Sequence, residues 1–164
     1  MVLTVLQEKL GEAHGLAIAA ADTLDKVEAR LVNHPLRRQI DTMRVEANET
    51  RARCLDAEGG FDAQTAAEIL AHANTVDEKA ADLAAAWFKA GTGPLAAWSF
   101  LAMGEAAEVA AWAALSSLAG RDGGAPIAEL AAWALPVQER HLRLALDGAV
   151  LLAADLDPAA PRWG

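Results

Sequence analysis

The amino-acid sequence predicts an all-α fold made of two antiparallel helical hairpins that are joined by a longer crossover segment. Apolar residues recur at helical spacing, glycine and proline fall between these periodic segments, and the apolar–polar alternation of a β-strand is absent. Of the 164 residues, 54% are hydrophobic and many of these are alanine, which suits closely packed helices. We expect one domain over residues 1–154 and an extended tail over residues 155–164.

A continuous apolar stripe and a short turn predict the first hairpin. Steps of three and four residues place one stripe along a first helix: Leu3, Leu6, Leu10, Ala13, Ala17, Ala20, Leu24, Val27 and Leu31. Asn33-His34-Pro35 ends this helix, and we expect Pro35 at the first position of the next helix, which Gly59 and Gly60 end. Because the turn is short, the two helices should run antiparallel.

The crossover segment is expected to hold two helices with a break near Asn74. Asp62 can cap the first of them. Thr75 and Glu78 have the spacing of a capping box, which predicts that a second helix starts there. The whole segment is long enough to cross the length of a helical bundle.

The second hairpin begins with the most apolar helix of the chain. The sequence Gly-Thr-Gly-Pro at residues 91–94 precedes this helix, and a Gly-rich turn around Gly123 separates it from a last helix that reaches about Ala154. We expect Trp163 to hold the C-terminal tail in place. Two antiparallel helix pairs joined by a crossover describe a four-helix bundle.

Charge and cysteine content exclude several classes of function. The net charge of −9 and the lack of a basic run argue against a nucleic-acid surface. Cys54 is the single cysteine, so an intrachain disulfide is excluded, and its helical register places it in the core. The run from Pro94 to Gly120 is as long as a membrane span, but two glutamates near its centre argue against one. With no secretory signal visible, we expect a cytoplasmic protein with neither membrane nor nucleic-acid partners.

Two glutamates lie within the most apolar helix. In the stretch FLAMGEAAEVAAWAAL, the only polar residues are Glu105 and Glu108. At about 100° per residue they lie about 60° apart, on the face that also carries Trp98 and Trp112. A buried ionised carboxylate is costly unless it is paired, protonated or bound to a metal ion. The alternative is that this strip faces water at the edge of the bundle and that the pair only favours solubility.

The segment EAAEVAAWAAL, from Glu105 to Leu115, resembles the E-x-x-E-x-A-A-[YW] helix of the stress-associated ferritin-like domains. The Ala-Glu-Gly sequence that ends the second helix at Gly59 and the expected split crossover helix are similar to that family as well. The resemblance implies a ferritin-like four-helix bundle that holds two iron or manganese ions. It also implies a function in metal handling or oxidative-stress protection.

The resemblance further implies which residues hold the metal ions. Hard iron or manganese ions favour oxygen ligands, and each of four helices can direct one inward. Carried over residue by residue, the ligands are Glu105 and Glu108 from the third bundle helix, Glu46 from the second and Glu139 from the fourth, with His141 as a further candidate.

The sequence departs from the family's ligand pattern. Where the family has E-x-x-H, Glu46 is followed at that spacing by Glu49. Glu139 and His141 are two residues apart, which is about 200° around a helix, so they cannot both face one ion. The first helix carries no acid on its apolar stripe. The six-ligand set of the family is therefore incomplete.

Two functions remain open from the sequence. In the first, a reduced iron or manganese site carries out redox chemistry. In the second, the bundle binds no metal and serves as a binding or structural interaction module. Glu105 and Glu108 would then share a proton, pair with an arginine such as Arg53, or face water. The sequence leaves open whether the protein is an enzyme.

A homodimer is predicted if the two glutamates face the interior. The outer side of the same helix would then present an apolar patch: Phe100, Met103, Ala107, Ala114 and Leu118. A patch of this size is usually covered, and a twofold copy of the same chain is the commonest cover. The alternative cover is the crossover segment, which carries Leu83, Trp87 and Phe88.

Overall fold

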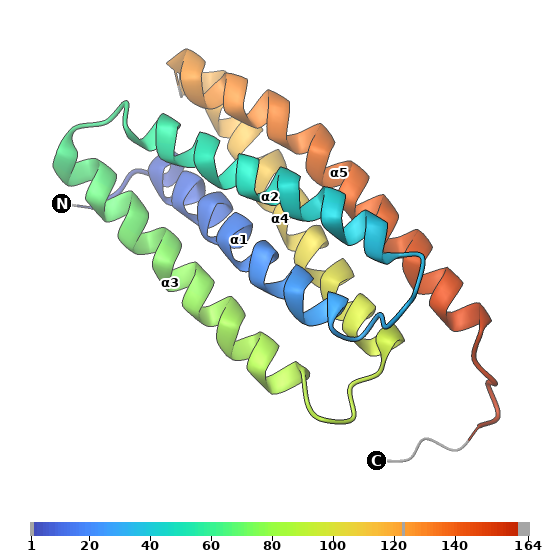
Figure 1. The fold of residues 1–164 in the computed structure, drawn as a ribbon. Helices are drawn as coiled ribbons and strands as arrows, with labels where there is room; N and C mark the ends of the chain where they lie inside the picture. Colours follow the sequence, from blue (N-terminus) through green and yellow to red (C-terminus); the bar gives the residue numbers. More distant parts are fainter. Residues whose placement is uncertain (1, 123, 161–164) are drawn as a thin grey trace.

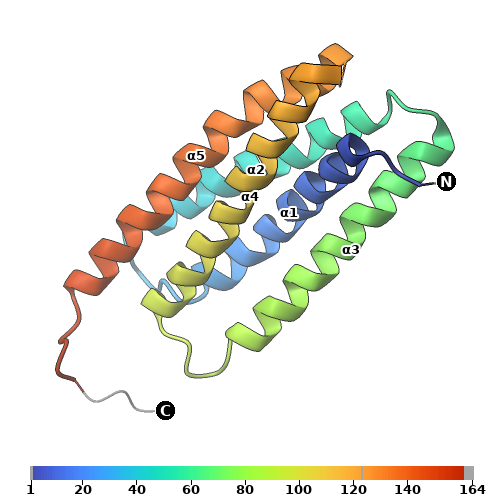
Figure 2. The ribbon, with the colours of Figure 1, turned by 180° about the vertical axis from the view of Figure 1, so that it is seen from behind.

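The computed structural model describes residues 2–122 and 124–160, and within these residues the chain is all-α (Figure 1). Five helices follow one another: α1 (Val5–Glu28), α2 (Arg37–Glu58), α3 (Ala63–Trp87), α4 (Pro94–Asp122) and α5 (Gly124–Ala154). Figures 1 and 2 show the helices lying side by side along one common direction. In the described part of the chain, no helix is long and apolar enough to cross a membrane.

Helix α1 is the centre of the packing. It contacts α2, α3 and α4, while α5 packs against α4 and α2. Helix α3 therefore lies mainly on α1, outside the group formed by α1, α2, α4 and α5. Figure 2 shows α3 along one side of the molecule, separated from α5 by α1 and α4.

Local hydrogen bonds explain where the helices begin. Thr4 and Gln7 form a capping box at the start of α1, with the Gln7 amide 3.3 Å from the Thr4 hydroxyl and the Thr4 amide 2.8 Å from Gln7 Oε1. Asp62 accepts hydrogen bonds from the amides of Gln64 and Thr65 at the start of α3, as the sequence predicted. Asn33 adopts a φ of 57°, the left-handed conformation that turns the chain between α1 and α2.

The predicted break near Asn74 is wrong, because α3 continues unbroken from Ala63 to Trp87. The Thr75 hydroxyl donates to the Ala71 carbonyl at 3.0 Å, which is an interior helical hydrogen bond and not a cap. The capping-box spacing had no glycine or proline before it to end the preceding helix. Alanine-rich sequence on both sides favours continuation.

Two other helix ends differ from the sequence prediction or fall outside the description. Helix α2 starts at Arg37, so Pro35 lies in the turn and not at the first helical position. The Leu36 amide donates to His34 Nδ1 at 3.2 Å and holds this turn. Helix α5 ends at Ala154, as expected. Trp163 lies outside the described residues.

Two glycines allow α3 to lie close to α1. A Cβ atom at Gly15 would lie 2.4 Å from the Ala73 carbonyl oxygen and 2.7 Å from Val76 Cβ. At Gly11 it would lie 2.9 Å from the Ile69 carbonyl oxygen. Since the obstructing atoms include main-chain oxygens, they cannot rotate away. The absence of side chains at these two positions is therefore what sets the α1–α3 distance.

The apolar core consists of two clusters that lie at different heights along the helices. One surrounds Trp98 and includes Ile40 and Met43, and the other surrounds Trp112 and includes Cys54. Trp98 Nε1 donates to the Ala145 carbonyl at 2.5 Å, so the buried indole is satisfied. Along α4, the two glutamates fall between these clusters.

We expect Gly15→Ala to destabilise the protein by about 1–3 kcal/mol, because the new methyl group overlaps the α3 main chain. Gly120→Ala is the matched control, since a Cβ there meets nothing within 4 Å. Replacing glycine by alanine in an open helical position should stabilise by about 0.5–1 kcal/mol. Urea unfolding followed by circular dichroism measures both changes. Equal stability of the two variants would show that α3 does not lie this close to α1.

Candidate functional site

A belt of buried polar residues separates the two apolar clusters. We call these residues the polar belt: Thr50, Glu105, Glu108, Gln138 and His141. Only 2% of Glu105 and 3% of Glu108 is exposed, so both face the interior and the solvent-facing alternative is wrong. Helical spacing of three residues brings Glu105 and Glu108 together on α4. The same spacing brings Gln138 and His141 together on α5.

A chain of charged groups crosses the polar belt from α2 to α4. His141 Nε2 lies 2.6 Å from Glu46 Oε2, and His141 Nδ1 lies 3.5 Å from Glu105 Oε2. Arg140 Nη2 lies 2.5 Å from the other oxygen of Glu46. Three helices are thus linked by one imidazole ring placed between two carboxylates.

The surroundings of His141 and Glu46 favour their charged forms. Burial lowers the pKa of His141, but hydrogen bonding and charge from Glu105 and then Glu46 outweigh it and raise the pKa above its ordinary value. Burial raises the pKa of Glu46, but Arg140 and His141 outweigh it and lower that pKa. The ring of His141 therefore lies between two carboxyl groups that favour its protonated form.

Glu108 differs from Glu105 because no ion pair joins it to a cation among the described residues. Burial, together with the negative charge of Glu105, raises the pKa of Glu108 well above its ordinary value. Its Oε2 atom has no hydrogen-bond partner among the described residues. Glu108 thus presents an unsatisfied buried oxygen beside Glu105, whose own Oε2 makes only a 3.5 Å contact with His141.

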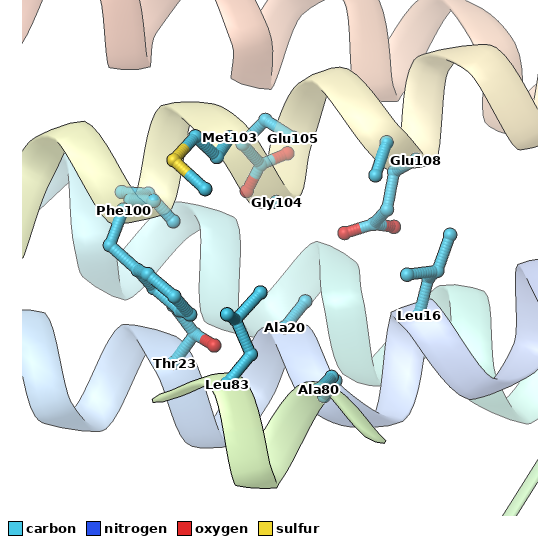
Figure 3. A pocket seen from close by; sticks show the side chains of 13 residues that line it. Leu16, Ala20, Thr23, Ala80, Leu83, Phe100, Met103, Gly104, Glu105 and Glu108 are labelled. Atoms are coloured by element: carbon cyan, nitrogen blue, oxygen red, sulfur yellow. The ribbon is translucent and has the colours of Figure 1, made fainter. Parts of the chain in front are cut away.

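A cavity of about 290 Å³ lies beside the two glutamates, between α1, α3 and α4 (Figure 3). Apolar side chains form most of its wall: Leu16, Ala20, Ala80, Leu83, Phe100 and Met103. Figure 3 shows the side chains of Glu105 and Glu108 extending from α4 towards this space. Leu83 and Met103 are 52% and 47% exposed, so the cavity reaches the surface between them.

The structure brings together only part of the predicted metal-ligand set. Glu46, Glu105 and His141 meet in the polar belt, and Glu108 lies next to Glu105. Glu139 is exposed to solvent, because the two-residue spacing that turns His141 inward turns Glu139 outward.

The donor set does not fit a two-ion centre. Both oxygens of Glu46 contact Arg140 or His141, and both ring nitrogens of His141 face carboxylates. A cation such as Arg140 would also repel a metal ion at Glu46. Within the described residues, no group of three or more His, Cys, Asp or Glu side chains is arranged to hold a metal ion.

Two further expectations about single residues need correction. Arg53 pairs with Glu49 on its own helix, at 2.7 Å, and lies 4.0 Å from the centre of the Trp133 ring. It therefore does not neutralise the buried glutamates. Phe100, expected in an exposed patch on the outer side of α4, is only 6% exposed. The alternative cover, the crossover segment, is observed here: Trp87 and Phe88 lie against Phe100, with ring centroids at 5.6 and 5.2 Å.

Three polar residues of the interior were not predicted as functional. His14 Nδ1 lies 2.6 Å from Glu58 Oε1, and both side chains are buried. The signal for this pair in the sequence was weak, because His14 only borders the apolar stripe of α1 and Glu58 lies at the predicted end of α2.

Gln138 is fully buried, and neither atom of its amide group has a partner among the described residues. Its spacing of three from His141 was the available signal.

Cys54 is buried in the cluster around Trp112, as its register predicted. Burial first, and then the negative charges of Glu58 and Glu108, raise its pKa far above the ordinary value. The thiol is therefore held in its unreactive protonated form.

Comparison of this chain with protein-family models, with curated proteins and with solved structures found no match in any of the three. The resemblance to the stress-associated ferritin-like domains stays a prediction made from the sequence.

We expect the free energy of unfolding to fall as pH rises above about 4.5, with a contribution of up to about 1.4 kcal/mol per pH unit from Glu108. The folded protein binds this proton more tightly than the unfolded chain, so raising the pH costs stability until the folded-state pKa is passed. Glu108→Gln keeps a neutral polar group in place and should remove this contribution, leaving the variant more stable than the wild type at neutral pH.

Urea unfolding at a series of pH values measures the difference between the two proteins. The control is Glu129→Gln on the exposed side of α5, which should run parallel to the wild type. His141 also loses stabilising charge as pH rises, but this loss is common to all three proteins. A constant difference between wild type and Glu108→Gln across the pH series would mean that folding does not raise the pKa of Glu108.

Proposed function

We propose that the protein is a binding module that takes a small, largely apolar molecule into the cavity between α1, α3 and α4. In this proposal α1, α2, α4 and α5 form a ferritin-like four-helix bundle, and α3 is an added helix that closes the side of the cavity. The observation that carries the proposal is an apolar space of about 290 Å³ with two buried carboxyl groups in its wall. A mostly apolar pocket with a few polar groups is the usual form of a small-molecule site.

The size of the cavity sets the size of the ligand. An engineered apolar cavity of about 150 Å³ binds benzene. The space here is nearly twice as large, so it suits a molecule of about ten non-hydrogen atoms. Small-molecule sites begin at about 300 Å³, and a ligand of this size would fill the cavity without moving the helices.

Metal handling is the second candidate function, and one observation favours it. Glu46, Glu105 and His141 come from three helices and meet in one place. Iron or manganese binding at this place, with a role in oxidative-stress protection, stays a prediction. The contacts of Arg140 with Glu46 and the exposure of Glu139 make it the weaker candidate.

The homodimer and the cytoplasmic location also stay proposals. Since Phe100 is covered within the chain, the exposed part of the predicted α4 patch is reduced to Met103 and Ala107. These two residues lie at the cavity, so a second copy docked there would also cover its opening.

We expect indole and 2-phenylethanol to raise the melting temperature of the wild type in proportion to the logarithm of their concentration, because both fit the cavity. Gly104→Leu should abolish this shift. Gly104 lines the cavity, and a Cβ atom there meets nothing within 4 Å, so the added side chain fills the ligand space. Gly120→Leu is the matched control on the same helix, because its position is equally open and lies away from the cavity.

The same proteins should be offered Fe(II) and Mn(II) without oxygen, and bound metal counted. Stoichiometric metal in the wild type that is lost in Glu46→Ala would replace our proposal by the metal function. Equal melting shifts of the wild type and Gly104→Leu with both organic probes would also contradict the proposal.

A further inference from the structure

We infer that the ligand of this cavity carries a primary ammonium group on its apolar body, and that Glu108 and Glu105 bind this group. The inference rests on the proposed function and names the chemical class of the ligand. The observation that leads to it is that two carboxyl oxygen atoms in the cavity wall lack good hydrogen-bond donors.

These two oxygens lack good hydrogen-bond donors. Glu108 Oε2 has no partner among the described residues, and Glu105 Oε2 makes only the 3.5 Å contact with His141. Both residues are buried and line the cavity. Buried polar atoms in proteins are nearly always hydrogen-bonded, so an orphaned oxygen in a cavity wall marks the place of a donor. The N–H groups of an ammonium ion are donors, so an ammonium group on the ligand can supply the hydrogen bonds that both oxygens lack.

The charges around the two oxygens favour a cation over a neutral donor. Helix α4 contributes Glu105 and Glu108, and α5 contributes His141 with Arg140 beyond it. Helix α2 contributes Glu46 and, on the side of Glu108, the thiol of Cys54 and the carboxyl group of Glu58, which pairs with His14 of α1. On the other walls of the cavity, Thr23 is the polar residue from α1, and α3 contributes Ala80 and Leu83. Among the described residues, His141 and Arg140 lie against Glu46 and Glu105, and no cation pairs with Glu108.

One ammonium group completes this balance. Bound in the cavity, it pairs with the carboxyl group of Glu108. Its three N–H groups can reach more than one acceptor, which suits two neighbouring carboxyl groups. A carboxylate ligand would place a further acidic group beside Glu105 and Glu108 and is disfavoured by repulsion. The rest of the ligand fills the apolar space lined by Leu16, Leu83 and Phe100.

Three probes with the same phenyl body test the inference: 2-phenylethylamine, 2-phenylethanol and phenylacetate. We expect isothermal titration calorimetry at pH 7 to give a dissociation constant for the amine at least tenfold lower than for the alcohol, and no binding of phenylacetate.

Glu108→Gln should weaken binding of the amine at least tenfold. The alcohol should bind this variant within about threefold of the wild type, because the amide can still hydrogen-bond to it. Glu129→Gln, on the exposed side of α5, is the matched control and should leave all three results unchanged. The alcohol thus reports whether the cavity of each variant remains intact.

The outcomes separate this inference from the proposed function. If the alcohol binds the wild type but not Gly104→Leu, and the amine binds no tighter than the alcohol, the ammonium inference is wrong while the binding function stands. If the alcohol and the amine each bind the wild type and Gly104→Leu equally well, the ammonium inference and the proposed binding function are both wrong. Tight binding of phenylacetate would also contradict the inference, because it would place a positive charge where we find carboxyl groups.

Discussion

Two carboxyl groups buried side by side on α4 are the constraint that the rest of the interior has to meet. Removing a carboxylate from water costs several kcal/mol unless a partner compensates for it. Glu105 meets this requirement with His141, and His141 in turn contacts Glu46, which Arg140 neutralises from the surface. Glu108 has no such partner among the described residues, and burial raises its pKa. Three helices are thereby fixed in register by one small set of charges.

Different parts of the core therefore have different roles. The clusters around Trp98 and Trp112 contain apolar residues from several helices and supply the hydrophobic stabilisation. The polar belt between them contains orphaned atoms on Glu108 and Gln138, which a core selected for stability alone would not retain. Buried polar atoms without hydrogen-bond partners are expected at functional sites, where local rules of stability are broken.

Periodicity was sufficient to predict the all-α fold and to place Glu105 and Glu108 on one face of a helix, because both depend on spacing within one helix. It left open whether that face lies in the interior, which packing of the other helices decides. It could not predict the contact of Glu46 with His141, which joins residues 95 positions apart on different helices. The close approach of α3 was also missed, since Gly11 and Gly15 lie off the predicted apolar stripe of α1. Between Glu139 and His141, the two-residue spacing showed that only one could face inward, and packing decided which.

Helix α3 is fastened at two places, and the cavity lies between them. Near its start it lies against Gly11 and Gly15, and at its end Trp87 Nε1 donates to the Ala96 carbonyl at 2.9 Å. The part of α3 that forms the cavity wall, with Ala80 and Leu83, is therefore held in place on both sides. A ligand that fits between these two contacts loses little binding free energy to rearrangement of the protein. A longer ligand would have to break one of the two contacts of α3. The positions of the two contacts of α3 would thus set the maximum length of the ligand.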